Sequence, residues 1–327
     1  MTGLPFDVNN ILSLSVDHFD ELCMDIFRFQ YQYNPVYHQW CTLLGIDPRT
    51  VKTPEQIPSL PVSFFKQQKV LTGEEATHFF ESSGTTQTQN SRHWVRDMNL
   101  YRQSFIAGFE RFYGKIDEWC ILALLPAYLE RQHSSLVMMA EELIQMTHHP
   151  RSGFYLYNHQ ELDYTLKELE AAGQKTLLLG VTFGLLDFAT AFPQQLKHTI
   201  VMETGGMKGR RKEMTRAEVH GFLGQQFGLS HIHSEYGMTE LLSQAYSKGD
   251  GIFECPPWLK VLARDEEDPL GQGQVGKGVL QLIDLANVYS CSFITTEDVG
   301  RVHEDGSFEV WGRLDHSDIR GCSLMVL

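Results

Sequence analysis

The sequence predicts an α/β protein whose body is a mainly parallel, helix-covered sheet, with a smaller antiparallel β subdomain packed on it. Three observations lead to this prediction. Short apolar runs typical of buried strands alternate with amphipathic helical segments through the middle of the chain, and short strands and turns take over after Pro256. The 327 residues, 42% of them hydrophobic, also suffice for a core at or beyond the limit of one compact domain.

The first part of the chain predicts a helix followed by a strand, a loop and a strand. Residues 15–34 place apolar side chains at helical spacing, so we expect an amphipathic helix capped by Ser15 that ends before Pro35. We interpret its aromatic residues as core. Residues 76–95 (ATHFFESSGTTQTQNSRHWV) indicate a strand, a Gly/Ser/Thr loop and a second strand.

The alternation of strands and helices occupies the middle of the chain. Apolar runs predict strands at 119–126 (WCILALLP), 176–188 (TLLLGVTFGLLDF), 198–203 (HTIVME) and 229–234 (LSHIHS). Helical spacing predicts helices at 129–146, 161–175 and 218–228. Because a helix follows most of these strands, the sheet should be mainly parallel.

Two turn sequences characterise the last part of the chain. PLGQGQVG (269–276) and HEDGS (303–307) separate short apolar runs, which favours an antiparallel arrangement. We therefore expect three parts: an α/β body over residues 1–255, a smaller β-rich subdomain over 256–312, and a short C-terminal tail over 313–327.

Composition excludes several classes of function. The net charge of −14 provides no basic face for a nucleic-acid backbone. The first residues lack the pattern of a signal peptide, and no apolar run approaches the ~20 residues of a membrane-spanning helix. The six cysteines are scattered without a CxxC pair, which is typical of reduced thiols. We expect a cytoplasmic protein with a small-molecule substrate.

A first candidate site is the loop in ESSGTT (81–86). Its glycine permits close backbone approach, and its hydroxyl groups can join backbone N–H groups around phosphate oxygens. The candidate residues are Ser82, Ser83, Gly84, Thr85 and Thr86. An ordinary polar β-turn explains this segment equally well when it is taken alone.

A second candidate site follows the strand expected at 229–234. The block offers an aromatic face for a purine, a hydroxyl for a phosphate and a carboxylate for Mg²⁺ within a few residues. Its members are Glu235, Tyr236, Gly237, Met238, Thr239 and Glu240. A solvated turn could hold the same residues, although their combination would then be accidental.

A third candidate site pairs Asp298, at the expected end of an apolar strand, with Arg313, which follows a glycine after another strand. The Asp298 carboxylate can accept hydrogen bonds from both hydroxyls of a ribose. In the alternative interpretation Asp298 caps a turn and Arg313 pairs with it on the surface, an interaction worth less than ~1 kcal/mol.

Taken in order, SSGTT, YGMTE, TTEDVGR and GRLD resemble the core motifs of the adenylate-forming superfamily of acyl-CoA synthetases and luciferases. ETGG (203–206), with Gly205 and Gly206, fits the loop that lies against the adenine in that superfamily. Three further segments are similar to the acyl-protein synthetase branch, the LuxE-like family: SRHWV, LPAYLERQHSSLVMMAEELI and DIRGCSLMV.

This resemblance implies the fold of the adenylate-forming large domain and the use of ATP and Mg²⁺. It implies that Thr239 contacts the α-phosphate, that Glu240 holds the metal, and that a fatty acyl group passes from its adenylate to the Cys322 thiol. A reductase partner or another acyl-carrying protein would receive the acyl group. In the alternative interpretation, Cys322 is a small hydrophobic residue beside other apolar residues of the tail.

Two departures from the superfamily pattern affect the expected mechanism. The phosphate loop lacks its usual lysine, so the positive charge must come from Arg92, His93, a metal or elsewhere. The chain also ends a dozen residues after GRLD, so we expect the mobile C-terminal domain and its catalytic lysine to be absent.

Other functional candidates have plain structural alternatives. His133, expected on a helix, could enter the acid pocket or act as a surface group. Met138 and Met139 could line an acyl tunnel, although core packing is the simpler interpretation.

Three functions remain open from the sequence. The first is an acid–thiol ligase that transfers a fatty acyl group to a protein cysteine. The second is an adenylating ligase that uses another acid and a free thiol such as CoA. The third is a nucleotide-binding subunit without turnover that positions a partner reductase.

Overall fold

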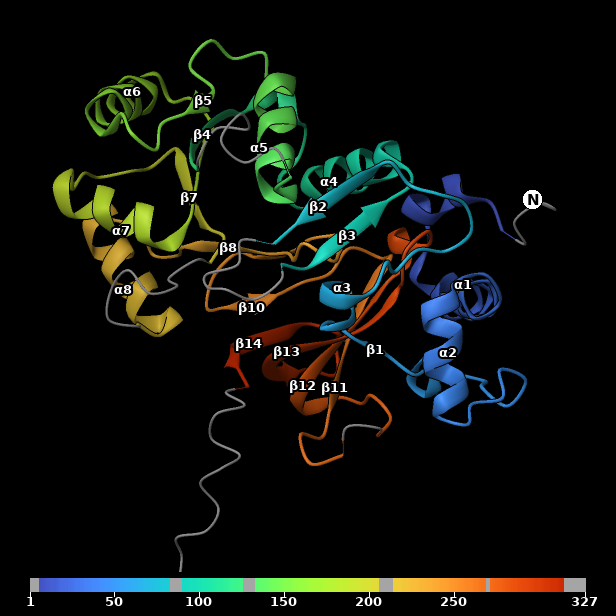
Figure 1. Ribbon diagram of the computed structural model, residues 1–327. Coiled ribbons are helices and arrows are strands. Elements are labelled where there is room, and N and C mark those ends of the chain that lie inside the picture. Colours follow the sequence, from blue (N-terminus) through green and yellow to red (C-terminus); the bar gives the residue numbers. More distant parts are fainter. Residues whose placement is uncertain (1–5, 83–89, 126–132, 206–213, 269–270, 315–327) are drawn as a thin grey trace, which may run out of the picture.

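The computed structural model describes residues 6–82, 90–125, 133–205, 214–268 and 271–314. Figure 1 shows helices around two sheets, with a short hairpin near them. One sheet has six strands in the order β5-β4-β6-β7-β8-β9, and the other has five in the order β10-β14-β13-β12-β11 with β1 beside β13. The α/β architecture predicted from the sequence is confirmed.

The first sheet is parallel except at one edge, where β9 runs antiparallel to β8. Its strands are β4 (Cys120–Leu124), β5 (Gly153–Phe154), β6 (Thr176–Gly180), β7 (Thr199–Glu203), β8 (His233–Tyr236) and β9 (Ala245–Ser247). The predicted strands at 119–126 and 198–203 are confirmed. The strand predicted at 229–234 begins four residues later, at His233, and includes the first residues of the candidate site.

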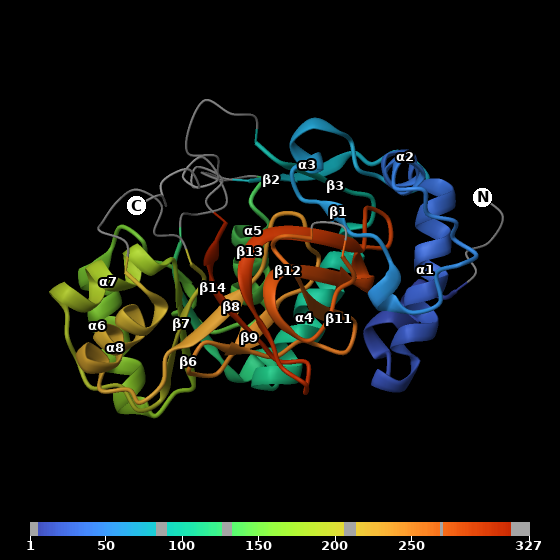
Figure 2. The ribbon, with the colours of Figure 1, turned by 90° about the horizontal axis from the view of Figure 1, so that it is seen from below.

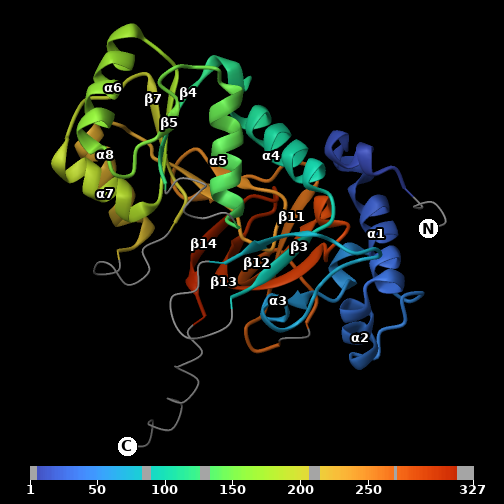
Figure 3. The same ribbon diagram turned by 45° about the horizontal axis from the view of Figure 1, so that its top comes forward.

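Helices cover both faces of this parallel sheet (Figure 3). α4 (Met98–Tyr113) and α5 (Ser135–Met146) pack on one face, and α6 (His159–Ala172), α7 (Thr182–Ala191) and α8 (Arg216–Phe227) pack on the other. Successive residues of β4 point to opposite faces of the sheet. Ile121 packs in the core under α4 and α5, and Leu122 packs in the core under α6, α7 and α8. Burial on both faces explains why these strands are continuous apolar runs.

The strand predicted over residues 176–188 is wrong in its second half. β6 ends at Gly180 and the helix α7 begins at Thr182. Both elements are buried, so neither shows the polar alternation that would separate strand from helix in the sequence. Gly180 permits the sharp change, because a Cβ there would lie 2.9 Å from side-chain atoms of Leu124 and Leu185.

The N-terminal helix begins later than predicted. α1 spans Phe19–Tyr33, and Ser15 instead precedes a short 3₁₀ turn, where its hydroxyl lies 2.7 Å from Nδ1 of His18. The predicted end is confirmed, because the side chain of Asn34 caps α2 (Pro35–Leu43) directly afterwards. The α1 aromatics belong to the core, as predicted: the Phe27 ring packs edge-on against Phe293 of the antiparallel sheet.

The antiparallel sheet is built from β11 (Leu259–Arg264), β12 (Gly276–Asp284), β13 (Phe293–Val302) and β14 (Phe308–Arg313). β1 (Leu60–Pro61) and β10 (Ile252–Phe253) extend it from elsewhere in the chain. The turn predicted at 303–307 joins β13 to β14, with Gly306 at φ +84°. The short helix α3 (Phe64–Gln67) follows β1.

A two-stranded hairpin carries the candidate phosphate loop. β2 (His78–Glu81) and β3 (Arg92–Val95) are the two strands that the sequence predicts on either side of this loop, and they pair antiparallel. The Tyr236 ring at the end of β8 packs against Phe308 of β14, so the two large sheets meet near these residues; Figure 2 views the same strands from below. Among the described residues no helix is both long enough and apolar enough to cross a membrane.

Candidate functional site

The second and third candidate sites meet where the two large sheets come together. The Tyr236 hydroxyl donates to Oδ2 of Asp298 at 2.8 Å, and Nε of Arg313 donates to Oδ1 at 3.1 Å. A single carboxylate therefore links β8, β13 and β14. Asp298 is almost buried, whereas 57% of the Arg313 side chain is exposed, so this cluster opens to solvent on the arginine side.

Asp298 does not end a strand, as the sequence had suggested. It lies within β13, directly opposite Arg313 of β14. The two residues pair, as the alternative interpretation held, but Asp298 also accepts from the buried Tyr236 and is not a turn cap. A carboxylate held on both oxygens keeps a fixed position and still has lone pairs for a ligand.

Tyr236 supports this carboxylate from a buried position. Its ring packs against Phe253 and Phe308, and its hydroxyl is also 3.6 Å from the sulfur of Met238. Burial raises the pKa of Tyr236 well above its usual value, and the neighbouring charge of Asp298 adds to this. The phenol therefore remains a hydrogen-bond donor.

Glu240 lies close to this cluster and is 5% exposed. Burial raises the pKa of its carboxyl, and a hydrogen bond with Ser91 and the positive charges of Arg313 and Lys66 oppose that shift. The carboxyl has no ion-pair partner among the described residues. An acidic group in this state gains from a cation placed beside it, which fits the expected metal ligand.

The described part of the phosphate loop is its base. The backbone N–H of Ser91 donates to the Ser82 hydroxyl at 3.0 Å, and Glu81 pairs with Arg92 at 2.9 Å. These bonds close the hairpin below the loop. Four expected phosphate ligands lie outside the described residues: Ser83, Gly84, Thr85 and Thr86.

Of the two side chains considered as sources of positive charge, Arg92 lies exposed at the loop base and His93 does not qualify. His93 is fully buried, and burial lowers its pKa to about 4. At neutral pH the imidazole is therefore uncharged. Lys66 on α3, whose charge acts on Glu240, is a cation that the sequence patterns did not indicate.

Glu203, at the end of β7, is the centre of a separate buried network. Its carboxylate accepts from Thr182, Gly205 and Ser234. Burial alone would raise the pKa of Glu203, but its partners lower it to about 2. These partners are His220, Arg216, Gly205 and Ser234. The adjoining Gly205 adopts φ +72° with open space around it, whereas Gly206 lies outside the described residues.

Glu235 faces away from Tyr236, because successive residues of a strand alternate between faces. It stands opposite Tyr246 of β9, and one of its oxygens would lie 2.4 Å from a Cβ placed on Gly237. Burial raises the pKa of Glu235 to about 8, and the charge of Glu203 contributes. Glu235 is thus a mostly protonated carboxyl at neutral pH on the α4 side of the sheet.

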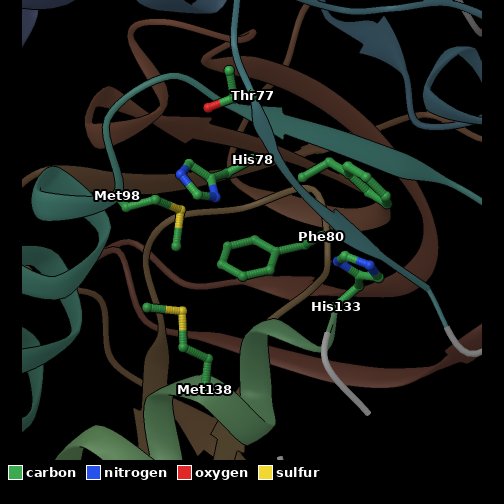
Figure 4. A pocket seen from close by; sticks show the side chains of 7 residues that line it. Thr77, His78, Phe80, Met98, His133 and Met138 are labelled. Carbon is green, nitrogen blue, oxygen red and sulfur yellow. The ribbon is translucent and has the colours of Figure 1, made fainter.

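A pocket of about 250 Å³ lies between β2, α4 and α5 (Figure 4). It is lined by Thr77, His78, Phe79, Phe80, Met98, His133 and Met138. His133 precedes α5 instead of lying on it, and its ring stacks on Phe79 at 4.3 Å between centroids. Met138 and Met139 both belong to the hydrophobic core, as the simpler interpretation predicted, and Met138 also lines this pocket.

Sequence reasoning missed the residues that hold the segment between β8 and β9. Asp284 accepts from the backbone of Leu242 and Ser243 and from the Ser243 hydroxyl, and Asn287 donates to the Glu240 carbonyl at 2.7 Å. Asp284 ends β12 and Asn287 lies in the short 3₁₀ turn that follows, each more than 40 residues from the segment it supports. No local pattern could have indicated this contact.

The remaining candidates for chemistry are the cysteines. Five are described, and all are free thiols whose pKa is raised by burial: Cys23, Cys41, Cys120, Cys255 and Cys291. Cys322 lies outside the described residues. In the part of the chain that is described, no three His, Cys, Asp or Glu side chains gather as a metal site.

Known proteins are similar to this chain in sequence and in fold. The chain is 24% identical to the long-chain-fatty-acid–luciferin-component ligase of Aliivibrio fischeri, over 93% of this chain and 86% of that protein. The corresponding ligase of Vibrio harveyi is 23% identical over 91% and 84%.

Solved adenylate-forming ligases have the same fold at low identity. A 2-hydroxyisobutyryl-CoA ligase in complex with 2-HIB-AMP and CoA superposes with a TM-score of 0.68 at 11% identity, over 94% of this chain and 71% of that one. ATP-bound MatB from Rhodopseudomonas palustris gives 0.54 at 15% identity, over 72% of this chain. The match spans about half of MatB, 47% of its length.

The family described as acyl-protein synthetase, LuxE, matches residues 12–327, nearly the whole chain. The fold, the family and the class of enzyme expected from the sequence motifs are thereby confirmed. This chain belongs to the LuxE family of acyl-protein synthetases, ligases built on the adenylate-forming fold.

Proposed function

We propose that this protein uses ATP to convert a fatty acid into its acyl-adenylate and then transfers the acyl group to a protein cysteine. The observation that carries the proposal is the convergence of Tyr236, Asp298 and Arg313, with Glu240 buried close by. These residues come from three of the motifs that resemble the adenylate-forming superfamily. The fatty-acid ligases among the relatives support the choice of substrate.

In the proposed first half-reaction, the substrate carboxylate attacks the α-phosphorus of ATP and pyrophosphate leaves. Asp298 would accept hydrogen bonds from the ribose hydroxyls, and Tyr236 and the Gly205–Gly206 turn would border the adenine. The Thr239 hydroxyl would contact the α-phosphate, while the 82–86 loop surrounds the other phosphates. Rate enhancement comes mainly from positioning and from stabilising charge on the phosphate oxygens.

Mg²⁺ would be held by Glu240 together with phosphate oxygens and would neutralise charge on the leaving pyrophosphate. Such a site needs one protein carboxylate, since Mg²⁺ in nucleotide enzymes retains water and phosphate ligands. This agrees with the lack of a three-residue metal cluster among the described residues. Arg92 and Lys66 are the cations we propose in place of the missing loop lysine.

For the second half-reaction we propose Cys322 as the acyl acceptor, which then passes the acyl group to a reductase partner. The five described cysteines are poor candidates, because their raised pKa values leave almost no thiolate at neutral pH. The thiolate would attack the acyl carbonyl carbon, the C–O bond to AMP would break, and AMP would leave. The free thiols also support a cytoplasmic location.

The pocket lined by Phe79, Phe80, Met98 and Met138 supports an apolar acyl chain. Methionine side chains adapt to flexible hydrocarbon groups, and aromatic rings provide a rigid wall. The pocket adjoins β2, the first strand of the phosphate hairpin.

The test is acid-dependent exchange of pyrophosphate into ATP, measured with short, long and aromatic carboxylic acids. We expect exchange with long-chain acids and, with labelled acid, label that stays on the denatured chain and is lost in Cys322→Ala. Label on Cys322→Ala would refute the acceptor assignment. Pyrophosphate exchange without label on the denatured chain would favour a free thiol acceptor. The absence of exchange with every acid would refute adenylation by this chain.

A further inference from the structure

A buried histidine connects the phosphate-loop hairpin to the segment that carries Thr239 and Glu240. His93 lies on β3 with 0% exposure. Its Nδ1 is 2.9 Å from the carbonyl oxygen of Thr239, and its Nε2 is 2.9 Å from Oδ1 of Asn287. The Phe65 ring packs edge-on against the imidazole and leaves it little freedom to rotate.

The orientation of Asn287 is fixed by its own partners. Its Nδ2 donates to two backbone carbonyls, those of Glu240 at 2.7 Å and Cys291 at 3.0 Å. Turning the amide over would place its oxygen against both carbonyls, so Oδ1 must face His93. Both ring nitrogens of His93 therefore face hydrogen-bond acceptors.

A neutral imidazole carries one N–H group, so only one of the two ring nitrogens can donate a hydrogen bond. Asn287 is already held by its two amide bonds. Among the described residues, His93 is the hydrogen-bond partner of the Thr239 carbonyl. Asn287 keeps its orientation through its own two donated bonds, whereas the Thr239 carbonyl has no other donor among the described residues, so we place the proton on Nδ1.

We propose that His93 is a positioning residue for adenylation, a role that rests on the function proposed above. Its Nδ1–H holds the Thr239 carbonyl directly, while Asn287 holds the adjoining Glu240 carbonyl. The Thr239 hydroxyl and the Glu240 carboxyl thereby keep a fixed placement relative to the hairpin that carries the phosphate loop. Displacing such groups by about 1 Å can slow a reaction by about 10²-fold.

Two substitutions separate the two nitrogens of His93. In His93→Asn the amide nitrogen takes the place of Nδ1 and can still donate to Thr239. In His93→Gln the amide lies at the position of Nε2 and the Thr239 bond is lost. Both variants remove the ring from the same buried site, so each controls for the packing change in the other.

The measurement is acid-dependent ATP–pyrophosphate exchange as a function of ATP and Mg²⁺ concentration, together with thermal unfolding. A second control, Glu170→Gln, disturbs a distant network in which Glu170 accepts from the backbone of Lys197 and His198. We expect His93→Asn to stay close to wild type. We expect His93→Gln to lose about 10- to 10²-fold in maximal exchange rate and to need more Mg²⁺.

Two results would overturn the assignment. One is a His93→Gln variant that exchanges like wild type. The other is an equal loss of exchange rate in both variants that parallels their fall in melting temperature, as expected for Glu170→Gln. That result would show that His93 only stabilises the fold. Failure of the underlying function is distinguishable, because the wild-type protein itself would then show no exchange with any acid.

Discussion

Two glutamates on neighbouring strands have pKa values that are shifted in opposite directions. Glu203 on β7 is surrounded by donors and a cation, and its pKa is lowered to about 2. Glu235 on β8 has no such partners among the described residues, and burial and the charge of Glu203 raise its pKa to about 8. The residue type is the same in both cases, and the difference lies in which face of the sheet each side chain occupies.

Glu235 should make the protein less stable as the pH rises. In the folded state it keeps its proton up to about pH 8, whereas the unfolded chain loses it near 4.5. Between these values the folded state binds more protons, so the free energy of unfolding falls with pH by up to about 1.4 kcal/mol per pH unit. Glu235→Gln, which mimics the protonated form, removes this contribution.

Urea unfolding from pH 5 to 8 checks this prediction. The stability of Glu235→Gln relative to wild type should increase across the range. Glu203→Gln is the matched control, because the contribution of Glu203 is complete above its unfolded pKa of 4.5 and is lost only toward pH 2. Its difference from wild type should therefore change only because the Glu203 charge no longer acts on Glu235, and by less than that of Glu235→Gln. A flat result for Glu235→Gln would show that its carboxyl is ionised in the folded state.

At the scale of elements, a bulge between β13 and β14 sets up the Asp298–Arg313 pair. Val302 lies opposite Phe308, and the pairing continues residue by residue to Gly300 opposite Val310. The register then shifts by one residue, so that Val299 lies opposite Gly312. Without that shift, Asp298 would stand opposite Gly312. Because neighbouring residues of a strand point to opposite faces, the bulge decides whether Arg313 can reach the carboxylate.

Gly300 is the residue that tolerates the bulge. A Cβ there would lie 1.9 Å from the carbonyl oxygen of Glu309, so we expect Gly300→Ala to cost about 1–3 kcal/mol of stability and to weaken ATP binding. Gly312→Ala, on the partner strand with no atom within 4 Å of the added Cβ, should change stability by less than about 0.5 kcal/mol. Chemical denaturation and nucleotide titration measure both effects, and equal costs for the two variants would contradict the role of the bulge.

At the scale of the whole molecule, the candidate site joins two independently built sheets. Tyr236 comes from the parallel sheet, and Asp298 and Arg313 come from the antiparallel sheet. The Thr239–Ser243 segment is also held by Asp284, Asn287 and the hairpin residue His93. A nucleotide bound here would contact both sheets and should stabilise the chain as a unit.

A non-cleavable ATP analogue with Mg²⁺ should therefore raise the unfolding temperature. Binding to the folded state alone contributes about 2.7 kcal/mol at a ligand concentration 100 times the dissociation constant. Differential scanning calorimetry measures the shift, and Asp298→Asn should reduce it by weakening the ribose contact. An unchanged shift in Asp298→Asn would place the nucleotide elsewhere.

The sequence by itself determined the family and the order of most strands and helices, and it predicted as site residues Tyr236, Asp298 and Arg313, which the structure brings together, and Glu240. Periodicity and short motifs carry this information because they depend on neighbouring residues. The sequence could not separate β6 from α7, since elements buried on every side lose their polar alternation.

Only the tertiary structure decided what supports the motifs. His93, Asp284 and Asn287 act on residues more than 40 positions away, and the sequence does not show these contacts. The register shift at Gly300 likewise appears only when β13 and β14 pair. The structure also shows why burial lowers the pKa of His93 and raises that of Glu235, while the partners of Glu203 lower its pKa. Protonation depends on desolvation and on partners brought together by folding, and for these residues the decisive neighbours are distant in the chain.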